Sequence, residues 1–171
     1  MKRLIALVAA FAAVSFATPT FAAEGKDEHP ALSRKPAAFE HLKSLVGAWE
    51  GVADGGHKGA TSFEVVANGS AIVERLDPMG ESPMINVYHP DGDAVVMTHY
   101  CGSGNQPRLR CTKDGSSLEF TMQDITNWKK GEARMSAVTL VLVDADHLKQ
   151  VWSSDTDGKV ESFTMEFTRK K

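Results

Sequence analysis

The sequence lacks the motifs that most often carry enzymatic chemistry. Only two cysteines, Cys101 and Cys111, occur among its 171 residues, and their spacing together with the histidine pattern completes no zinc-ligand set. No glycine-rich phosphate-binding loop is present. The triplet Gly102-Ser103-Gly104 lies in a predicted hairpin, where no helix follows to form a nucleophile elbow. We therefore expect no metal site, and no reaction is specified by a motif.

A concentration of positive charge is also missing. The chain has 19 Lys and Arg residues against 22 Asp and Glu residues, for a formal net charge of −3. The basic tail Arg169-Lys170-Lys171 is too short to alter this balance. Because nucleic-acid binding requires clustered positive charge, we expect no nucleic-acid partner.

The one long apolar run lies at the N-terminus. Lys2 and Arg3 precede an uncharged apolar stretch over 4–16, and Thr20-Phe21-Ala22 supplies the small residues of a cleavage site after Ala22. This order is typical of a secretory signal peptide. The run is shorter than the roughly 20 residues that span a bilayer. We therefore expect a signal peptide over 1–22, export to the periplasm or the medium, and no membrane span.

The rest of the chain divides into two parts. Residues 23–35 are polar and charged and predict a flexible leader. Residues 36–171 form a segment of ordinary single-domain size, with no internal repeat or low-complexity tract. Pro36 suits the first turn of a helix, and the apolar residues that follow at helical spacing end at Gly47. The domain is thus predicted to begin with one short amphipathic helix.

After this helix the pattern becomes that of short strands separated by turn residues. Asn68-Gly69 and Asp157-Gly158 are examples of the tight-turn chemistry between them. The predicted strands are 49–54, 60–66, 70–76, 84–89, 93–101, 108–113, 117–123, 136–143, 147–153 and 160–168. About ten strands joined by tight turns favour an all-β, antiparallel up-and-down barrel, with the helix closing one end. The segment 124–135 is expected to be an irregular loop.

Alternation within the strands predicts which side chains point inward. The inward set includes Met97, Phe120, Met122, Gln150, Trp152, Phe163 and Met165. A barrel of this size either packs solid or encloses one ligand, and the methionines would give a cavity wall adaptable contacts. Plain core packing is the alternative for each methionine.

The hairpin around residue 100 combines several candidate groups. Val95, Met97, His99 and Cys101 share one strand face, and Cys111 has inward parity on the next strand. In an oxidising compartment the two cysteines predict a disulfide, with two buried thiols as the alternative.

His99 is the principal candidate for function. An imidazole on an apolar inner strand can bind a ligand hydroxyl or carboxylate, ligate a haem iron or shuttle a proton. The alternative is a core histidine whose partner is Tyr100, Gln106 or a backbone carbonyl. Gln150 is predicted to point inward as a further polar group, and Arg108 at the hairpin rim is a candidate for recognising a carboxylate or an amide.

Two stretches resemble a known family. The segment 45–51, Leu-Val-Gly-Ala-Trp-Glu-Gly, resembles the opening of calycin barrels, the lipocalin and fatty-acid-binding superfamily. In that family a Gly-x-Trp follows the short helix, here Gly47 and Trp49. The resemblance implies that a basic side chain of the last strand, Arg169, covers the Trp49 ring. The run 97–108 is similar to a stretch in uncharacterised exported bacterial lipocalin-like proteins.

These features lead to three hypotheses, in this order. The first is an exported barrel that binds a small apolar or amphipathic molecule. The second is a small-molecule enzyme of the isomerase, lyase or hydrolase type that uses His99 with Gln150 or Tyr100. The third is a haem-binding barrel with His99 as ligand, by resemblance to nitrobindin-like barrels, whose ligand histidine falls nearer to His147. A purely structural role remains if the interior is solidly packed.

Overall fold

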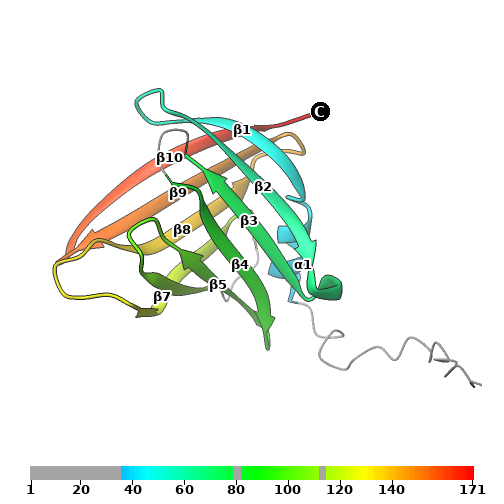
Figure 1. Ribbon diagram of the computed structural model, residues 1–171. Helices are drawn as coiled ribbons and strands as arrows, with labels where there is room; N and C mark the ends of the chain where they lie inside the picture. Colours follow the sequence, from blue (N-terminus) through cyan, green and yellow to red (C-terminus); the bar gives the residue numbers. More distant parts are fainter. Residues whose placement is uncertain (1–35, 79–81, 112–114) are drawn as a thin grey trace, which may run out of the picture.

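The computed structural model describes residues 36–78, 82–111 and 115–171, which form a closed antiparallel β-barrel (Figure 1). The predicted signal peptide over 1–22 and the predicted leader over 23–35 lie outside the described residues. The chain enters the barrel through helix α1, Ala37–Lys43. Within the described part of the chain, no helix has the length and apolar character needed to cross a membrane.

Each strand pairs with its neighbours in sequence, and β1 pairs with β10 to close the barrel. The strands are β1 Gly47–Ala53, β2 Lys58–Val66, β3 Ala71–Asp77, β4 Met84–Asp91, β5 Ala94–Tyr100, β6 Gln106–Cys111, β7 Leu118–Thr126, β8 Arg134–Leu142, β9 His147–Thr156 and β10 Lys159–Arg169. The predicted all-β, ten-stranded up-and-down barrel with one short helix is confirmed. Strands β7 and β8 extend into the stretch expected to be irregular, because β7 stays paired with β6 as far as Thr126.

The barrel end beside α1 is sealed by the pair that the family resemblance implied. The guanidinium of Arg169 lies 4.0 Å from the centroid of the Trp49 ring. The same guanidinium donates hydrogen bonds to the backbone oxygens of Ser44, Val46 and Ala145, and the Trp49 indole nitrogen donates to Leu45 at 2.8 Å. These bonds satisfy carbonyls left open where the helix ends, and so tie α1 to β1 and β10.

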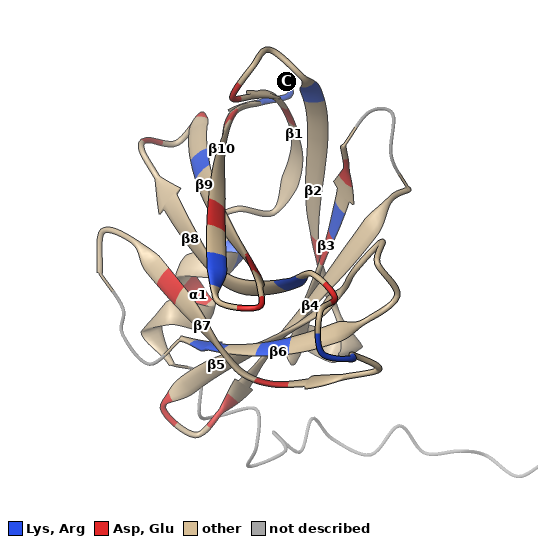
Figure 2. Ribbon diagram, turned by 90° about the vertical axis from the view of Figure 1, so that its left-hand side faces the viewer, with Lys and Arg blue, Asp and Glu red and all other residues tan. Residues whose placement is uncertain are grey.

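Apolar side chains from every strand fill the interior on the α1 side. Alternation places one face of each strand inward, and the fully buried members include Ile72, Val95, Leu109, Leu118 and Leu148. Tyr88 and Phe120 meet edge to face, with ring centroids 5.5 Å apart. The outer face carries interspersed charges of both signs (Figure 2), including ion pairs between neighbouring strands such as Arg108 with Asp124.

The predicted disulfide between Cys101 and Cys111 is wrong. Cys111 is buried, as expected, but strand register places it opposite Val95, and Cys101 is only half-buried. Cys101 lies six positions further along, beyond the end of β5, so the two are separated by about 20 Å at 3.3 Å per residue. A disulfide needs Cα atoms within about 7 Å, and no bond joins them.

Candidate ligand cavity

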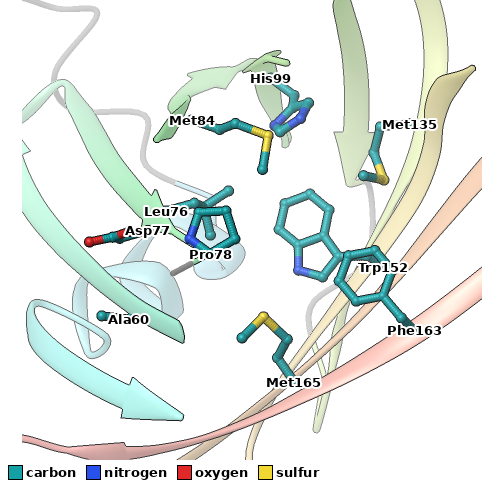
Figure 3. A pocket seen from close by; sticks show the side chains of 10 residues that line it. All are labelled: Ala60, Leu76, Asp77, Pro78, Met84, His99, Met135, Trp152, Phe163 and Met165. Atoms are coloured by element: carbon teal, nitrogen blue, oxygen red, sulfur yellow. The ribbon is translucent and has the colours of Figure 1, made fainter. Parts of the chain in front are cut away.

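A cavity opens at the barrel end away from α1, where the interior is not filled by core side chains. It has about 370 Å³ of empty space including its mouth, of which the centres of water-sized molecules can occupy about 50 Å³. Its lining residues are Ala60, Leu76, Asp77, Pro78, Met84, His99, Met135, Trp152, Phe163 and Met165. In Figure 3 the Asp77 carboxyl points away from the space between His99 and Met165. The wall is therefore apolar except at His99.

Four of the predicted ligand-binding residues meet at this cavity. His99 and Trp152 approach each other with ring centroids 5.5 Å apart, and Met165 faces them across the space (Figure 3). Phe163 pairs with Trp152 across β9 and β10 and is 42% exposed, so it stands at the mouth. The alternation of inward and outward side chains along β9 and β10 was thus sufficient to predict one wall of the cavity.

The other predicted ligand-binding residues lie elsewhere. Met97 and Phe120 are buried in the packed core, and Met122 is half-buried against it. Gln150 is fully buried but belongs to a hydrogen-bond network and is not in the cavity wall. Arg108, the candidate at the hairpin rim, lies on the outer face, where its guanidinium is bonded to Asp124 and does not line the cavity.

His99 combines deep burial with an unused ring nitrogen. The residue is 1% exposed, and its Nδ1 lies 2.7 Å from the side-chain oxygen of Asn86 on β4. The partners weighed from the sequence, Tyr100, Gln106 and a backbone carbonyl, do not fill this role. Burial lowers the pKa of His99 from 6.5 to about 4, so the ring is neutral at pH 7.

The Nε2 atom of His99 is buried and has no hydrogen-bond partner within the described residues. Asn105 Oδ1 is the other such atom, but the Asn105 amide nitrogen binds the Ala133 backbone oxygen at 2.9 Å, and Asn105 does not line the cavity. Buried polar groups in folded proteins almost always have a partner. Within the described residues, His99 is therefore the buried cavity-lining side chain whose hydrogen-bonding capacity is not fully used.

Glu74 on β3 lies at the centre of the hydrogen-bond network beneath this wall. It is fully buried and is contacted by four side chains. Its Oε1 is bonded to Thr61 at 2.9 Å and Gln150 at 2.7 Å, and its Oε2 to Asn86 and Tyr88 at 2.6 Å each. These four donors match the acceptor capacity of an ionised carboxylate.

The alternation of side chains along β3 and β4 contained a signal for this network, although the predicted site residues did not include Glu74 or Asn86. Ile72, Glu74 and Leu76 share one face of β3, so alternation places a carboxylate among inward apolar residues. Asn86 has the same inward parity on β4, two positions before the buried Tyr88. A polar residue on an apolar strand face is the feature that identifies such groups.

Haem does not fit this cavity. Its empty space of about 370 Å³ includes the open mouth, whereas a porphyrin is a rigid macrocycle of four pyrrole rings linked by methine bridges. Among the described residues, no Lys or Arg side chain lines the wall to meet the two propionates. His147, the late histidine suggested by the nitrobindin resemblance, is a surface residue bonded to the Asp144 carboxylate.

The arrangement also does not assemble the predicted catalytic groups. Tyr100 is 50% exposed on the outer face, and Gln150 is bonded to Glu74 rather than to His99. A histidine with a pKa near 4 is a weak base at neutral pH.

Comparison with known proteins agrees with the fold. No protein-family model matches the sequence, and no curated protein matches it either. Among solved structures, the chain is similar to Rv2717c from M. tuberculosis, with 14% identity, a TM-score of 0.56, and coverage of 79% of this chain and 98% of that one. It is also similar to a DUF3598-family protein of unknown function from Nostoc punctiforme, with 11% identity and a TM-score of 0.52, over 76% of this chain and 49% of that one. At these identities the likeness shows the fold alone.

Proposed function

We propose that this protein binds one small apolar or amphipathic molecule in the cavity, with the ligand's polar group hydrogen-bonded to His99 Nε2. The observation that supports this most is the buried Nε2 atom of the cavity-lining His99, which lacks a partner among the residues that the structure describes. Leaving such an atom unpartnered costs about 1–3 kcal/mol, and a ligand that supplies the hydrogen bond recovers this free energy.

The surrounding side chains suit a small and adaptable binding site. Met84, Met135 and Met165 contribute flexible, polarizable thioethers to the wall, which can adjust to ligands of different shape. Trp152 offers an aromatic face, and its indole nitrogen is already bonded to Gln150 at 3.0 Å. The volume limits the ligand to a compact molecule, unless Phe163 and the methionines move to widen the mouth.

The proposal also includes the cellular compartment in which the protein binds its ligand. The N-terminal pattern of Lys2, Arg3, the apolar run and Ala22 supports export to the periplasm or the medium. The Gly-x-Trp at Gly47 and the contact of Trp49 with Arg169 support membership of the calycin barrels, which bind small molecules in their interiors.

A displacement assay tests the proposed binding. A compact, uncharged, environment-sensitive dye such as 2-naphthol is added to the folded protein, followed by compact apolar competitors. Leu76→Phe should fill the cavity and reduce dye binding, because Leu76 lines it and is only 6% exposed. Val73→Phe is the matched control, because this residue lies on the opposite face of the same strand. Equal dye binding by both variants would contradict a cavity site.

A further inference from the structure

We propose that Glu74, which does not line the cavity, determines the chemical class of the ligand. Acting through Asn86, it keeps the cavity-facing nitrogen of His99 unprotonated, so the site takes apolar molecules that carry a hydroxyl or N–H donor. The statement about the ligand rests on the proposed function, whereas the statement about His99 concerns the protein alone.

The hydrogen bonds that run from Trp152 through Gln150, Glu74 and Asn86 to His99 form a relay. Its first step begins at Trp152. An indole nitrogen only donates hydrogen bonds, and Trp152 Nε1 lies 3.0 Å from the side-chain oxygen of Gln150. This contact fixes which way the Gln150 amide faces. Its nitrogen must then point to Glu74, and it donates to Oε1 at 2.7 Å.

The second step is the carboxylate of Glu74, which only accepts hydrogen bonds when ionised. Thr61 shares Oε1 with Gln150, and Tyr88 shares Oε2 with Asn86. Burial and the neighbouring charge of Glu74 hold the pKa of Tyr88 well above its usual value, so the phenol keeps its proton and donates it. Each oxygen of Glu74 therefore receives two donors.

The third step passes through the amide of Asn86. Because Glu74 accepts, Asn86 presents its nitrogen to Oε2 at 2.6 Å, and its oxygen must face His99. That oxygen lies 2.7 Å from His99 Nδ1, so Nδ1 carries the hydrogen. A neutral imidazole has a single N–H, so the Nε2 atom of this cavity-lining residue is left with a lone pair that has no partner among the described residues.

This lone pair defines the ligand class. A phenol, an alcohol or a heterocyclic N–H can donate to Nε2 while its apolar body contacts the methionines and Trp152. An aldehyde, a ketone, an ether or a carboxylate offers only lone pairs to the same atom. Such molecules would leave Nε2 unsatisfied and place two acceptors against each other.

Glu74→Gln should reverse the relay. The oxygen of the new amide would accept from Thr61 and Gln150, and its nitrogen would then face Asn86 and Tyr88. Asn86 would turn its oxygen to this nitrogen and its own nitrogen to His99. His99 Nδ1 would become the acceptor, and Nε2 would carry the hydrogen into the cavity.

NMR of the ligand-free, ¹⁵N-labelled protein at neutral pH tests the relay, since protonated and unprotonated ring nitrogens differ widely in ¹⁵N shift. We expect an unprotonated Nε2 in the wild type and in the control Glu119→Gln, whose glutamate is exposed on β7. We expect a protonated Nε2 in Glu74→Gln. A protonated Nε2 in the wild type overturns the proposal, even if the variant does not fold. An unchanged tautomer in a folded Glu74→Gln also overturns it.

Three probes of similar size test the ligand class. Phenol donates, benzaldehyde accepts, and toluene does neither. The wild type should bind phenol about tenfold more tightly than toluene or benzaldehyde, the equivalent of one net hydrogen bond. Glu74→Gln should prefer benzaldehyde. If the wild type binds none of the three, the proposed function and the ligand class both fail, while the NMR result still decides the role of Glu74.

Discussion

Asn86 on β4 lies directly opposite His99 on β5, and the two side chains meet inside the barrel at 2.7 Å. This pair connects the buried hydrogen-bond network of the interior to the cavity. On one side is a buried network centred on Glu74, and on the other is a largely apolar cavity lined in part by His99. Several measurements follow from the arrangement.

The stability of the protein should fall as the pH is lowered from about 6.5 towards 4. Burial depresses the pKa of folded His99 from 6.5 to about 4, so the unfolded chain binds more protons in this window. Stability therefore rises with pH there, and His99 accounts for up to about 3 kcal/mol of the difference. Urea unfolding between pH 7.5 and 4.5 measures it.

His99→Gln is the control for this pH dependence, because glutamine can donate to Asn86 but does not titrate. Other groups titrate equally in both proteins, so the difference between the two pH profiles isolates His99. Parallel profiles for wild type and variant would contradict a buried, neutral imidazole.

Replacing Arg169 should destabilise the barrel substantially. Arg169→Met removes the cation–π contact with Trp49 and three hydrogen bonds to backbone oxygens at the α1 end. We expect a loss of about 2–3 kcal/mol in the free energy of unfolding. Arg108→Met removes an exposed ion pair with Asp124 and should cost less than about 1 kcal/mol. Equal losses of unfolding free energy for the two variants would contradict the role of Arg169 in closing the α1 end of the barrel.

Glu74→Ala should lower stability far more than Glu74→Gln. The alanine would leave the buried donors of Thr61, Asn86, Tyr88 and Gln150 without their acceptor, at a cost of about 3–5 kcal/mol. Glutamine keeps the shape and most of the bonds. Thermal unfolding of both variants, beside the exposed Glu119→Ala, measures the contrast. A small effect of Glu74→Ala would mean that the network contributes little to the fold.

The purified protein should contain two thiols even without a reductant. The strand register keeps Cys101 and Cys111 too far apart to bond. In the native state Cys101 is half-buried and should react with a thiol reagent before the fully buried Cys111 does. After denaturation without reductant, both should react. A protein with no reactive thiol and a mobility change on reduction would contradict the register of β5 and β6.

The fold could be predicted from the sequence because alternation and turn residues are local signals. Phe163, Met165 and Phe167 show the inner face of β10 without reference to any other strand. Strand register is not local, and parity alone could not show that Cys111 pairs with Val95 instead of lying near Cys101.

The candidate site was predictable only in part, for the same reason. His99 and Trp152 were found from the apolar faces on which they lie, but the network that links them through Asn86, Glu74 and Gln150 also needs strands that are distant in sequence. Gln150 and Glu74, for example, are 76 positions apart and meet only when the barrel closes. The position of Glu74 between Ile72 and Leu76 was a usable signal that a charged residue pointed inward.

The central claim is that His99 Nε2 receives the polar group of a molecule in the cavity. The most direct measurement is a titration of the ¹⁵N-labelled protein with phenol, following the ring nitrogens of His99, with toluene as the matched control. We predict a saturable shift of the Nε2 signal with phenol and none of comparable size with toluene. No saturable change at Nε2 with phenol, in a protein that remains folded, would contradict it.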